Sequence, residues 1–402
     1  MSVMARLSRD DLAQVKALNP LDDIIDQRTK LKRANSRGIR EGQCICNPVR
    51  GKWPLWVNAQ TSTWGCLARG SVCGGDTFTF LEQFDGLDFQ AALASMCGAE
   101  AVRDPEAAAK MEAERAARGA EHDARAKALA EDERAKAYAI WQNAGPVAET
   151  LVDAYFAHRG LDPVRSKALR FSAAEPYWHA PEDAGAKPSI VHRGPCMLAA
   201  IQGPDGRFLG LHRTWLDPRL GTAEMPREAS GKAEILAADG APLPAKKMRG
   251  GKQGGAIRLH DWHEGSGERV FLCGEGIETV ETVYLAVHRG FGVNYCAWAA
   301  GDLGNISGKA LGLSSRHPTK PGRWIPSEEP DPDAPGLMPP AGAAKAIILG
   351  DGDSDPLVTM ARLECARRRW SRAGCPTEVR MAPEGSDYND LARGQIEGMG
   401  QP

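Results

Sequence analysis

The stretch VFLCGEGIETVETVYLA, residues 270–286, decides how the C-terminal part of the chain folds. Four apolar residues that end at Cys273 predict a short buried strand, and the glycines on either side of Glu275 end it. After Gly276, apolar residues recur with the period of a helix as far as Ala286. The pattern predicts a strand that carries an acid at its C-terminal tip, where open α/β sheets place their chemistry.

The same pattern recurs downstream. Further strands are predicted over residues 292–299, 345–350 and 377–381, and a helix over residues 357–373. The second of these strands runs directly into Asp351-Gly352-Asp353. Strands that alternate with helices predict an α/β domain with a mostly parallel sheet, whose strand tips gather along one edge. We therefore expect Glu275, Asp351 and Asp353 to converge.

Three carboxylates that meet at neutral pH repel one another unless a cation lies among them. Hard oxygen ligands select Mg²⁺ or Mn²⁺, and such sites serve phosphoryl transfer. The sequence therefore predicts a divalent-metal site at this edge of the sheet.

Glu275 within EGIET, followed by Asp351-Gly352-Asp353 after a hydrophobic strand, resembles the Toprim domain of bacterial-type primases, topoisomerases and related nucleases. The resemblance implies that Glu275 moves a proton or organises the metal, and that Asp351 and Asp353 hold the ion. The alternative is an unrelated α/β domain with surface acids at its strand ends.

Further acids lie close to this motif in the sequence. Asp355 comes two residues after Asp353, where the family has a small residue and a glycine, and it would add a fourth carboxylate to the metal site. The final acidic segment resembles one at the same place in the family, so Asp387 and Asp390 are expected to extend the cluster.

The composition is that of a soluble globular protein, with 42% hydrophobic and 25% charged residues. No apolar run approaches the length of a membrane span and no signal-peptide core is visible, so a cytoplasmic location is expected. A chain of 402 residues predicts several domains. We expect a basic helical segment (1–40), a zinc-ribbon-like β module (41–98), a charged helical linker (99–138), a mixed α+β domain (139–267) and the Toprim-like α/β domain (268–395).

Four clustered cysteines suit a structural zinc ion, namely Cys44, Cys46, Cys66 and Cys73. Their segment resembles the zinc ribbon of bacterial-type primases, where it would help to engage template through tryptophans such as Trp53, Trp56 and Trp64. The spacing departs from the family, because Val49 stands where a histidine is usual and the last cysteine is displaced. Either Cys44 replaces the histidine, or the ribbon has lost its zinc and keeps only its core.

The mixed domain contains a glycine-rich basic segment with the chemistry to hold phosphates. Its cations are Lys246, Lys247, Arg249 and Lys252, and Arg213 is expected to line the same groove. A mobile surface loop with incidental lysines is the alternative. With its flanking strands, the segment resembles the first subdomain of the primase core, especially in phage and mobile-element primase-like proteins.

A proline-rich stretch, residues 311–341, predicts a surface loop.

The order of these parts predicts a DNA primase-like nucleotidyltransferase that makes RNA primers on single-stranded DNA from ribonucleoside triphosphates with Mg²⁺ or Mn²⁺. A replicative helicase, where needed, is expected on a separate chain, because only eleven residues follow Leu391. Two alternatives stay open. The first is a Toprim nuclease, in which water attacks with the same carboxylates. The second is a DNA-binding accessory protein without catalysis.

Overall fold

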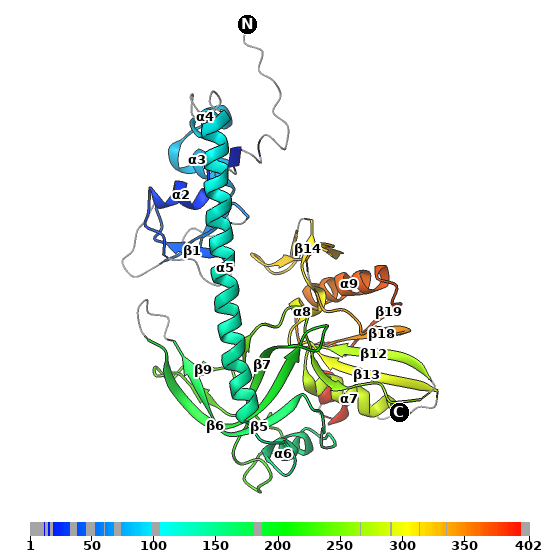
Figure 1. Cartoon of the computed structure of the whole chain (residues 1–402). Helices are drawn as coiled ribbons and strands as arrows, with labels where there is room; N and C mark the ends of the chain where they lie inside the picture. The colour runs from blue at the N-terminus through cyan, green and yellow to red at the C-terminus, as the bar shows by residue number, and fades with distance from the viewer. Residues whose placement is uncertain are drawn as a thin grey trace. The chain divides into compact units, whose positions relative to one another are not determined.

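A computed structural model shows a mixed α/β chain with several sheets (Figure 1). It describes residues 12, 15–16, 19–32, 38–45, 53–59, 61–67, 74–97, 105–180, 187–265, 267–289, 292–312, 314–334 and 336–394, without the side chains of residues 105–119 and 121–123. The chain divides into two compact units, Met1–Ala128 with Glu182–Gly185, and Leu129–Pro181 with Ala186–Pro402. None of the helices within these described ranges has the length and apolar character needed to cross a bilayer.

The first unit is built on a small antiparallel sheet with strand order β1-β2-β3-β4. Its elements are α2 (Leu21–Asp26), β1 (Ile39–Gly42), β2 (Leu55–Asn58), β3 (Thr63–Cys66), β4 (Gly74–Gly75), α3 (Thr77–Asp85) and α4 (Phe89–Cys97). Trp64 lies at the centre of its core and packs edge-on against Phe80 and Phe84. Asp76 caps α3 by accepting a hydrogen bond from the backbone N–H of Thr79. The helices α3 and α4 make this unit richer in helix than the expected β module.

A long helix, α5 (Pro105–Asn143), begins in the first unit and ends in the second. Alanine, glutamate, lysine and arginine dominate it, and they favour helix without supplying an apolar face. The helix therefore forms where a charged helical segment is expected, and it continues to Asn143. Among the side chains of this helix that the structure describes, the buried ones are Ala137 and Trp141 in its last turns.

The second unit contains an antiparallel sheet with strand order β10-β7-β6-β5. Its elements are α6 (Leu151–His158), β5 (Leu169–His179), β6 (Ser189–Gln202), β7 (Phe208–Trp215), β8 (Ile235–Leu236), β9 (Pro242–Leu243) and β10 (Lys246–Gly250). The basic segment is thus not a mobile loop. It forms β10 because residues Lys246 to Gly250 all pair with β7, between Gly210 and Thr214.

The same unit contains a five-stranded sheet with order β11-β13-β12-β18-β19, in which only the edge strand β11 is antiparallel. Its elements are β11 (Ile257–His260), β12 (Glu268–Gly274), α7 (Ile277–Val287), β13 (Val293–Ala299), α8 (Leu303–Ser307), β18 (Lys345–Gly350), α9 (Pro356–Arg372), β19 (Thr377–Met381) and α10 (Tyr388–Ala392). These bounds agree closely with the predicted strands and helices, which confirms the mostly parallel sheet.

Both faces of this sheet are covered, which explains why its strands are continuous apolar runs. Along β12, Leu272 packs on the side of α7, whereas Phe271 and Cys273 pack on the side of α9. Figure 1 shows α7 on one side of strands β12 and β13, and α8 and α9 on the other.

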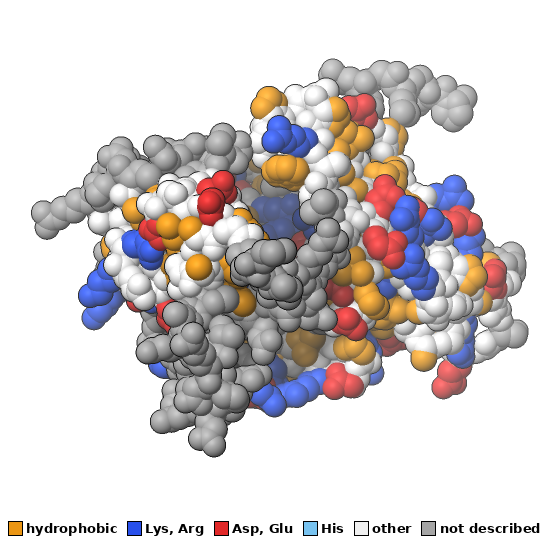
Figure 2. All heavy atoms as spheres, turned by 90° about the horizontal axis from the view of Figure 1, so that it is seen from above, with side chains coloured by type: hydrophobic (Ala, Val, Ile, Leu, Met, Phe, Trp, Pro, Cys, Tyr) orange, Lys and Arg blue, Asp and Glu red, His pale blue; other side chains and the backbone are white. Residues whose placement is uncertain are grey.

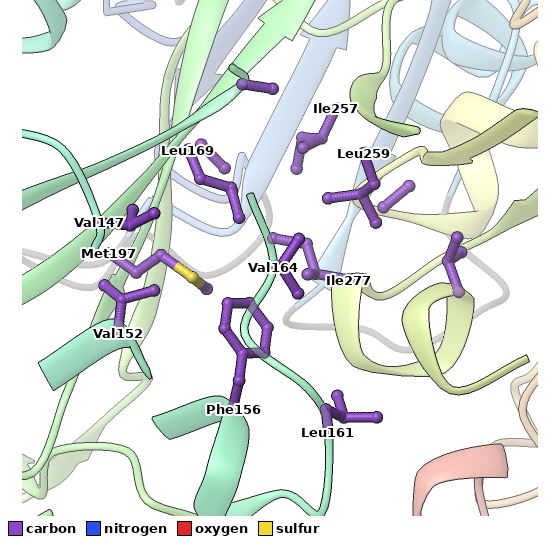
Figure 3. Packing of buried hydrophobic residues seen from close by; sticks show 14 of the residues in the cluster. Val147, Val152, Phe156, Leu161, Val164, Leu169, Met197, Ile257, Leu259 and Ile277 are labelled. Carbon is purple, nitrogen blue, oxygen red and sulfur yellow. The ribbon is translucent and has the colours of Figure 1, made fainter. Parts of the chain in front are cut away.

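One hydrophobic core joins the two sheets of the second unit. Phe156 from α6, Met197 from β6 and Ile277 from α7 belong to the same buried cluster, as Figure 3 shows. Ile257 and Leu259 on β11 belong to the same cluster. The two sheets are therefore packed as one body, and β11 belongs to the parallel sheet although it precedes residue 268.

The proline-rich stretch is more than the surface loop that its composition predicts. It contains four short strands in two pairs, β14 (Ala310–Leu311) with β17 (Glu329–Pro330), and β15 (Ser315–Arg316) with β16 (Trp324–Ile325). Arg368 and Arg372 of α9 bind Glu328 and Glu329 at 2.5 Å. His317 and Leu337 are buried, so the stretch is anchored on α9 and on the core beneath it.

Candidate active site

The two central strands of the parallel sheet end side by side. Gly274, the last residue of β12, pairs with Leu349 of β18. Glu275 follows β12 directly, and Asp351 follows Gly350, the last residue of β18. The chain leaves β12 toward β13, which lies on one side of this pair of strands, and it leaves β18 toward β19, which lies on the other side. This divergence makes the strand tips a topological switch point, which is where open α/β sheets bind ligands.

The carboxylates expected at this edge do influence one another. Burial raises the pKa of Glu275 to about 7, helped by the charges of Asp351, Asp302 and Asp353. Burial also raises the pKa of Asp351 to about 6, helped by Asp387 and Asp353 and opposed by a hydrogen bond from Thr279. The carboxylates of Glu275, Asp351, Asp353 and Asp302 therefore lie near enough for their charges to affect one another, and we call these four residues the carboxylate cluster.

Close backbone contacts hold the loop that carries the aspartates. Gly352 donates its N–H to the carbonyl of Ser386 at 2.8 Å and accepts from the N–H of Gly385 at 2.8 Å. A Cβ atom at Gly352 would overlap the carbonyl oxygens of Ala382 and Pro383. Only glycine fits there, and the tight contact fixes Asp351 and Asp353 on either side of it.

Thr279 orients Asp351 from the first turn of α7. Its hydroxyl donates to Asp351 Oδ1 at 2.9 Å, and Thr279 is itself buried. Asp353, by contrast, is exposed and open to a ligand. The cluster thus combines one held carboxylate with one exposed carboxylate.

Oxygen donors of this kind fit Mg²⁺ or Mn²⁺, because a divalent cation would offset both the burial and the mutual repulsion that raise the two pKa values. Throughout the described ranges, no three His, Cys, Asp or Glu side chains are already close enough to form a metal site.

Asp355 lies elsewhere than its sequence position suggests, and we revise the expectation that it is a fourth metal ligand. Its carboxylate caps α9 by accepting hydrogen bonds from the N–H groups of Leu357 and Val358 at 3.2 Å each. It also binds Lys320 Nζ at 2.7 Å and His317 Nε2 at 3.1 Å. The hydrogen bond from Lys320 is the main cause that holds the pKa of Asp355 well below its usual range. Both oxygens are therefore occupied.

The two aspartates of the final acidic segment, Asp387 and Asp390, also have different roles. Asp387 caps α10 through the N–H of Asp390 at 2.7 Å, and its charge reaches Asp351. Asp390 returns the contact to the backbone of Asp387 as the second half of a capping box. Asp387 is thus a neighbour of the cluster, whereas Asp390 serves the helix end.

Beside the carboxylates lies a buried polar group centred on Glu278. It accepts hydrogen bonds from the hydroxyl of Tyr155 and from Lys246 Nζ at 3.3 Å, and Lys232 Nζ lies 3.9 Å away. Burial opposes ionisation of Glu278, but the two lysines outweigh it and hold its pKa well below the usual value. Lys246 also favours the charged form of Glu275. The charge of Lys246 therefore favours the ionised form of both acids.

The other predicted phosphate-binding cations are more scattered. Lys252 pairs with Asp302, Arg249 binds Glu133 at 3.1 Å, and Lys247 packs over the ring of Tyr177. An open groove of about 690 Å³ is lined by Trp178, Lys187, Pro188, Arg213, Lys247, Met248 and Arg249. Figure 2 shows basic and acidic side chains interspersed where described residues are visible, most clearly in its right-hand part.

Arg213 and its neighbour His212 are largely structural. The Arg213 side chain is 8% exposed, binds Glu175 Oε1 at 3.1 Å and stacks on Trp215. A buried ion pair of this kind is engaged within the fold, which removes most of its expected capacity to contact nucleic acid. His212 is buried, and burial lowers its pKa to about 4, so the imidazole is neutral at pH 7.

Several residues of the site were not predicted, among them Asp302, Thr279, Lys232, and the buried pair Tyr155 and Glu278. Asp302 had a signal in the sequence, because it follows a strand and Gly301 just as Glu275 follows β12 and Gly274. Thr279 and Lys232 had no such signal, since only the folded chain brings them to Asp351 and Glu278.

Of the expected zinc ligands, Cys46 and Cys73 lie outside the described residues. Cys44 and Cys66 are buried in the core of the first unit with Trp64. Trp64 is 1% exposed, so it is a core residue and not a platform for bases. Trp53 and Trp56 are half-buried, and the ring of Trp53 is covered by Lys32 Nζ, 4.4 Å from its centre.

A family profile described as a domain of unknown function, DUF7146, matches residues 131–259. No curated protein sequence matches the chain. Similar solved structures include the zinc-binding and RNA polymerase domains of the Aquifex aeolicus primase, at 12% identity and a TM-score of 0.31, with 95% of this chain and 82% of that one covered.

Two further structures give similar values. A DNA primase domain from Pseudomonas aeruginosa shares 14% identity at a TM-score of 0.31, with 62% of this chain and 68% of that one covered. The RNA polymerase domain of Mycobacterium tuberculosis primase DnaG shares 16% at a TM-score of 0.29, with coverages of 66% and 78%. The chemistry of the site therefore has to be judged from its own residues.

Proposed function

We propose that the chain is a primase-type nucleotidyltransferase, which joins ribonucleotides on a single-stranded DNA template. The observation that carries the proposal is the pair Glu275 and Asp351 at the switch point of the parallel sheet, both with raised pKa values. Carboxylates under mutual repulsion are suited to bind a divalent cation. Their order and strand contexts also match the Toprim pattern.

In this proposal, Asp351 and Asp353 hold Mg²⁺ or Mn²⁺, with Glu275 and Asp302 beside them. The ion would supply charge neutralisation for the triphosphate and help to orient the attacking 3′-hydroxyl. Thr279 keeps Asp351 turned toward the site. Glu275, with a pKa of about 7, is able to hold or release a proton near neutral pH.

Lys246 and Lys232 are the proposed partners of the triphosphate. Both approach Glu278, at 3.3 Å and 3.9 Å, and both keep partly exposed side chains. A phosphate that approaches the carboxylate cluster would meet these two cations first, which offsets the repulsion from the acids. Lys247 and Arg249, which line the open groove, are proposed to contact the template backbone.

The test is de novo synthesis from labelled ribonucleotides on single-stranded DNA with Mg²⁺ or Mn²⁺. We expect Glu275→Gln and Asp351→Asn to lower the rate at least about a hundredfold, because each removes a charge from the reacting centre. Glu268→Gln, at an exposed position on β12, is the matched control and should keep the wild-type rate.

The other outcomes have distinct meanings. Metal-dependent loss of the DNA without RNA product would indicate a nuclease that uses the same carboxylates. DNA binding without either reaction would indicate an accessory protein. A wild-type rate in both carboxylate variants would contradict the proposed site.

We further propose one structural zinc ion in residues 41–98, a cytoplasmic location and a separate helicase as partner. Zinc content of the purified protein, compared with a Cys66→Ser variant, tests the first of these. Equal zinc content in the two proteins would contradict it.

A further inference from the structure

A basic segment without acids is inserted between the second and third strands of the parallel sheet. No Asp or Glu occurs between Asp302 and Glu328. The same interval carries Lys309, Arg316, His317, Lys320, Arg323 and Trp324. Most of these residues belong to residues 315–325, which form the β15–β16 hairpin.

The β15–β16 hairpin is fixed beside the loop that carries the aspartates. His317, 3% exposed, binds Asp355 at 3.1 Å through Nε2, while its Nδ1 accepts from the backbone N–H of Lys320 at 3.0 Å. Lys320 Nζ reaches Asp355 at 2.7 Å. Asp355 is only two residues beyond Asp353. The hairpin is therefore anchored next to the proposed metal ligands.

Its outer surface pairs an exposed aromatic ring with a cation. Trp324 is 50% exposed, and it lies directly opposite Arg316 across the two strands. The Arg316 guanidinium is 5.7 Å from the centre of the indole ring. Among the described residues, no acid is paired with Arg316. Half of each of the Lys320 and Arg323 side chains also remains exposed.

We propose that the β15–β16 hairpin binds single-stranded DNA and guides it past the carboxylate cluster. An exposed ring stacks on a base, whatever its sequence, and nearby cations contact the phosphates. Asp351 and Asp353 repel a polyanion that approaches them, and the positive charges of the β15–β16 hairpin beside them offset that repulsion. The role as a template guide rests on the proposed function, whereas DNA binding by the hairpin does not depend on catalysis.

The experiment measures binding of a fluorescently labelled oligothymidylate by anisotropy, with the full chain, in EDTA and over a series of salt concentrations. Trp324→Ala should weaken binding about tenfold, and Trp324→Phe should restore most of the affinity because a ring remains. Arg316→Ala should weaken binding and lower the slope of log K against log salt by about 0.7, as expected for one lost phosphate contact.

Two control variants match these changes. Arg289→Ala removes the same charge from an exposed position after α7, on the opposite face of the sheet. Leu311→Ala truncates an exposed apolar side chain on β14. Both should bind the oligonucleotide as the wild type does.

Wild-type affinity in Trp324→Ala and Arg316→Ala would overturn the hairpin proposal and leave primer synthesis untouched. Weaker binding in these variants, in a protein that makes no primers, would support the hairpin and reject the proposed enzyme. Tighter binding of an RNA oligomer than of DNA would assign the hairpin to the product strand and overturn its role as a template contact. A wild-type chain that binds no oligonucleotide would also overturn it.

Discussion

At the scale of single residues, burial and neighbouring acids together set the protonation of the candidate site. Glu275 is half-buried among acids, and its pKa of about 7 means that ionisation costs free energy in the folded chain. The unfolded chain does not bear this cost, because its glutamates titrate near their ordinary value. The folded state therefore binds an extra proton between about pH 4.5 and 7, and its stability falls as the pH rises through that range.

Glu275→Gln should remove this loss. At pH 8 in EDTA we expect the variant to be more stable than the wild type by about 2 kcal/mol, after allowance for solvent screening, and the difference should disappear near pH 4.5. Urea unfolding of both proteins at the two pH values measures this difference in stability. Glu268→Gln changes an exposed residue at the start of β12, so its difference in stability from the wild type should be the same at both pH values. A stability difference between Glu275→Gln and the wild type that does not change with pH would contradict the raised pKa of Glu275.

The residue type alone did not show which aspartates of this loop face solvent and which cap a helix. Asp353 and Asp355 are two positions apart in the same loop, yet Asp353 faces solvent while Asp355 closes the end of α9. The difference arises from the helix, whose free N–H groups at Leu357 and Val358 draw in the nearest carboxylate. The proline after Asp355 was a usable signal for this cap, since proline favours the first turn of a helix.

At the scale of elements, the loop between β18 and α9 decides how the aspartates are presented. Gly352 is in contact with the backbone of residues 382 and 383, which follow β19. Two loops at neighbouring strand ends are thereby locked together, through hydrogen bonds to Gly385 and Ser386.

Gly352→Ala should separate these loops. A methyl group has no space beside the carbonyl oxygens, so we expect a loss of about 2–3 kcal/mol in the free energy of unfolding. Primer synthesis should fall as well, because Asp351 and Asp353 both move. Denaturant unfolding and the ribonucleotide assay measure the two effects. Gly374→Ala, at a helix end where a Cβ meets no atom, tests the effect of the substitution without a close contact, although its positive φ of 89° adds backbone strain. Unchanged stability in Gly352→Ala would contradict the close packing.

The elements most faithfully predicted are those with continuous apolar runs. β18 and β19 have the bounds that the sequence predicts, because strands buried on both faces must be apolar throughout. β10 was missed, since its lysines and glycines have low strand propensity and only its pairing with β7 makes it a strand. The two-residue strands β14 to β17 were missed because they lie in a proline-rich stretch, whose composition predicts a surface loop.

At the scale of the whole molecule, the second unit behaves as one packed body. One core holds Met197 of β6 and Phe156 of α6 together with Leu272 of β12 and Ile277 of α7. β11 pairs with β13, although a boundary at residue 267 places them in different domains. Burial of this shared core should make the two sheets unfold together.

A fragment of residues 129–394 should therefore fold and unfold in one cooperative transition. A fragment of residues 139–267 should not fold alone, because Ile257 and Leu259 lose their partners and β11 loses the strand that it pairs with. Circular dichroism during thermal unfolding and limited proteolysis distinguish the two fragments. A stable, cooperative fold in the shorter fragment would contradict the shared core.

The sequence by itself determined the parallel sheet, its helices and the acids at its strand tips, because apolar runs, glycine breaks and helix periodicity are local patterns. Only the tertiary structure decided which charged residues serve the site. It brought Thr279, Asp302 and Lys232 to the cluster, gave Asp355 to α9 and enclosed Arg213 with Glu175. A charged side chain takes its role from the partners and burial that folding gives it, and these come from residues distant in the sequence.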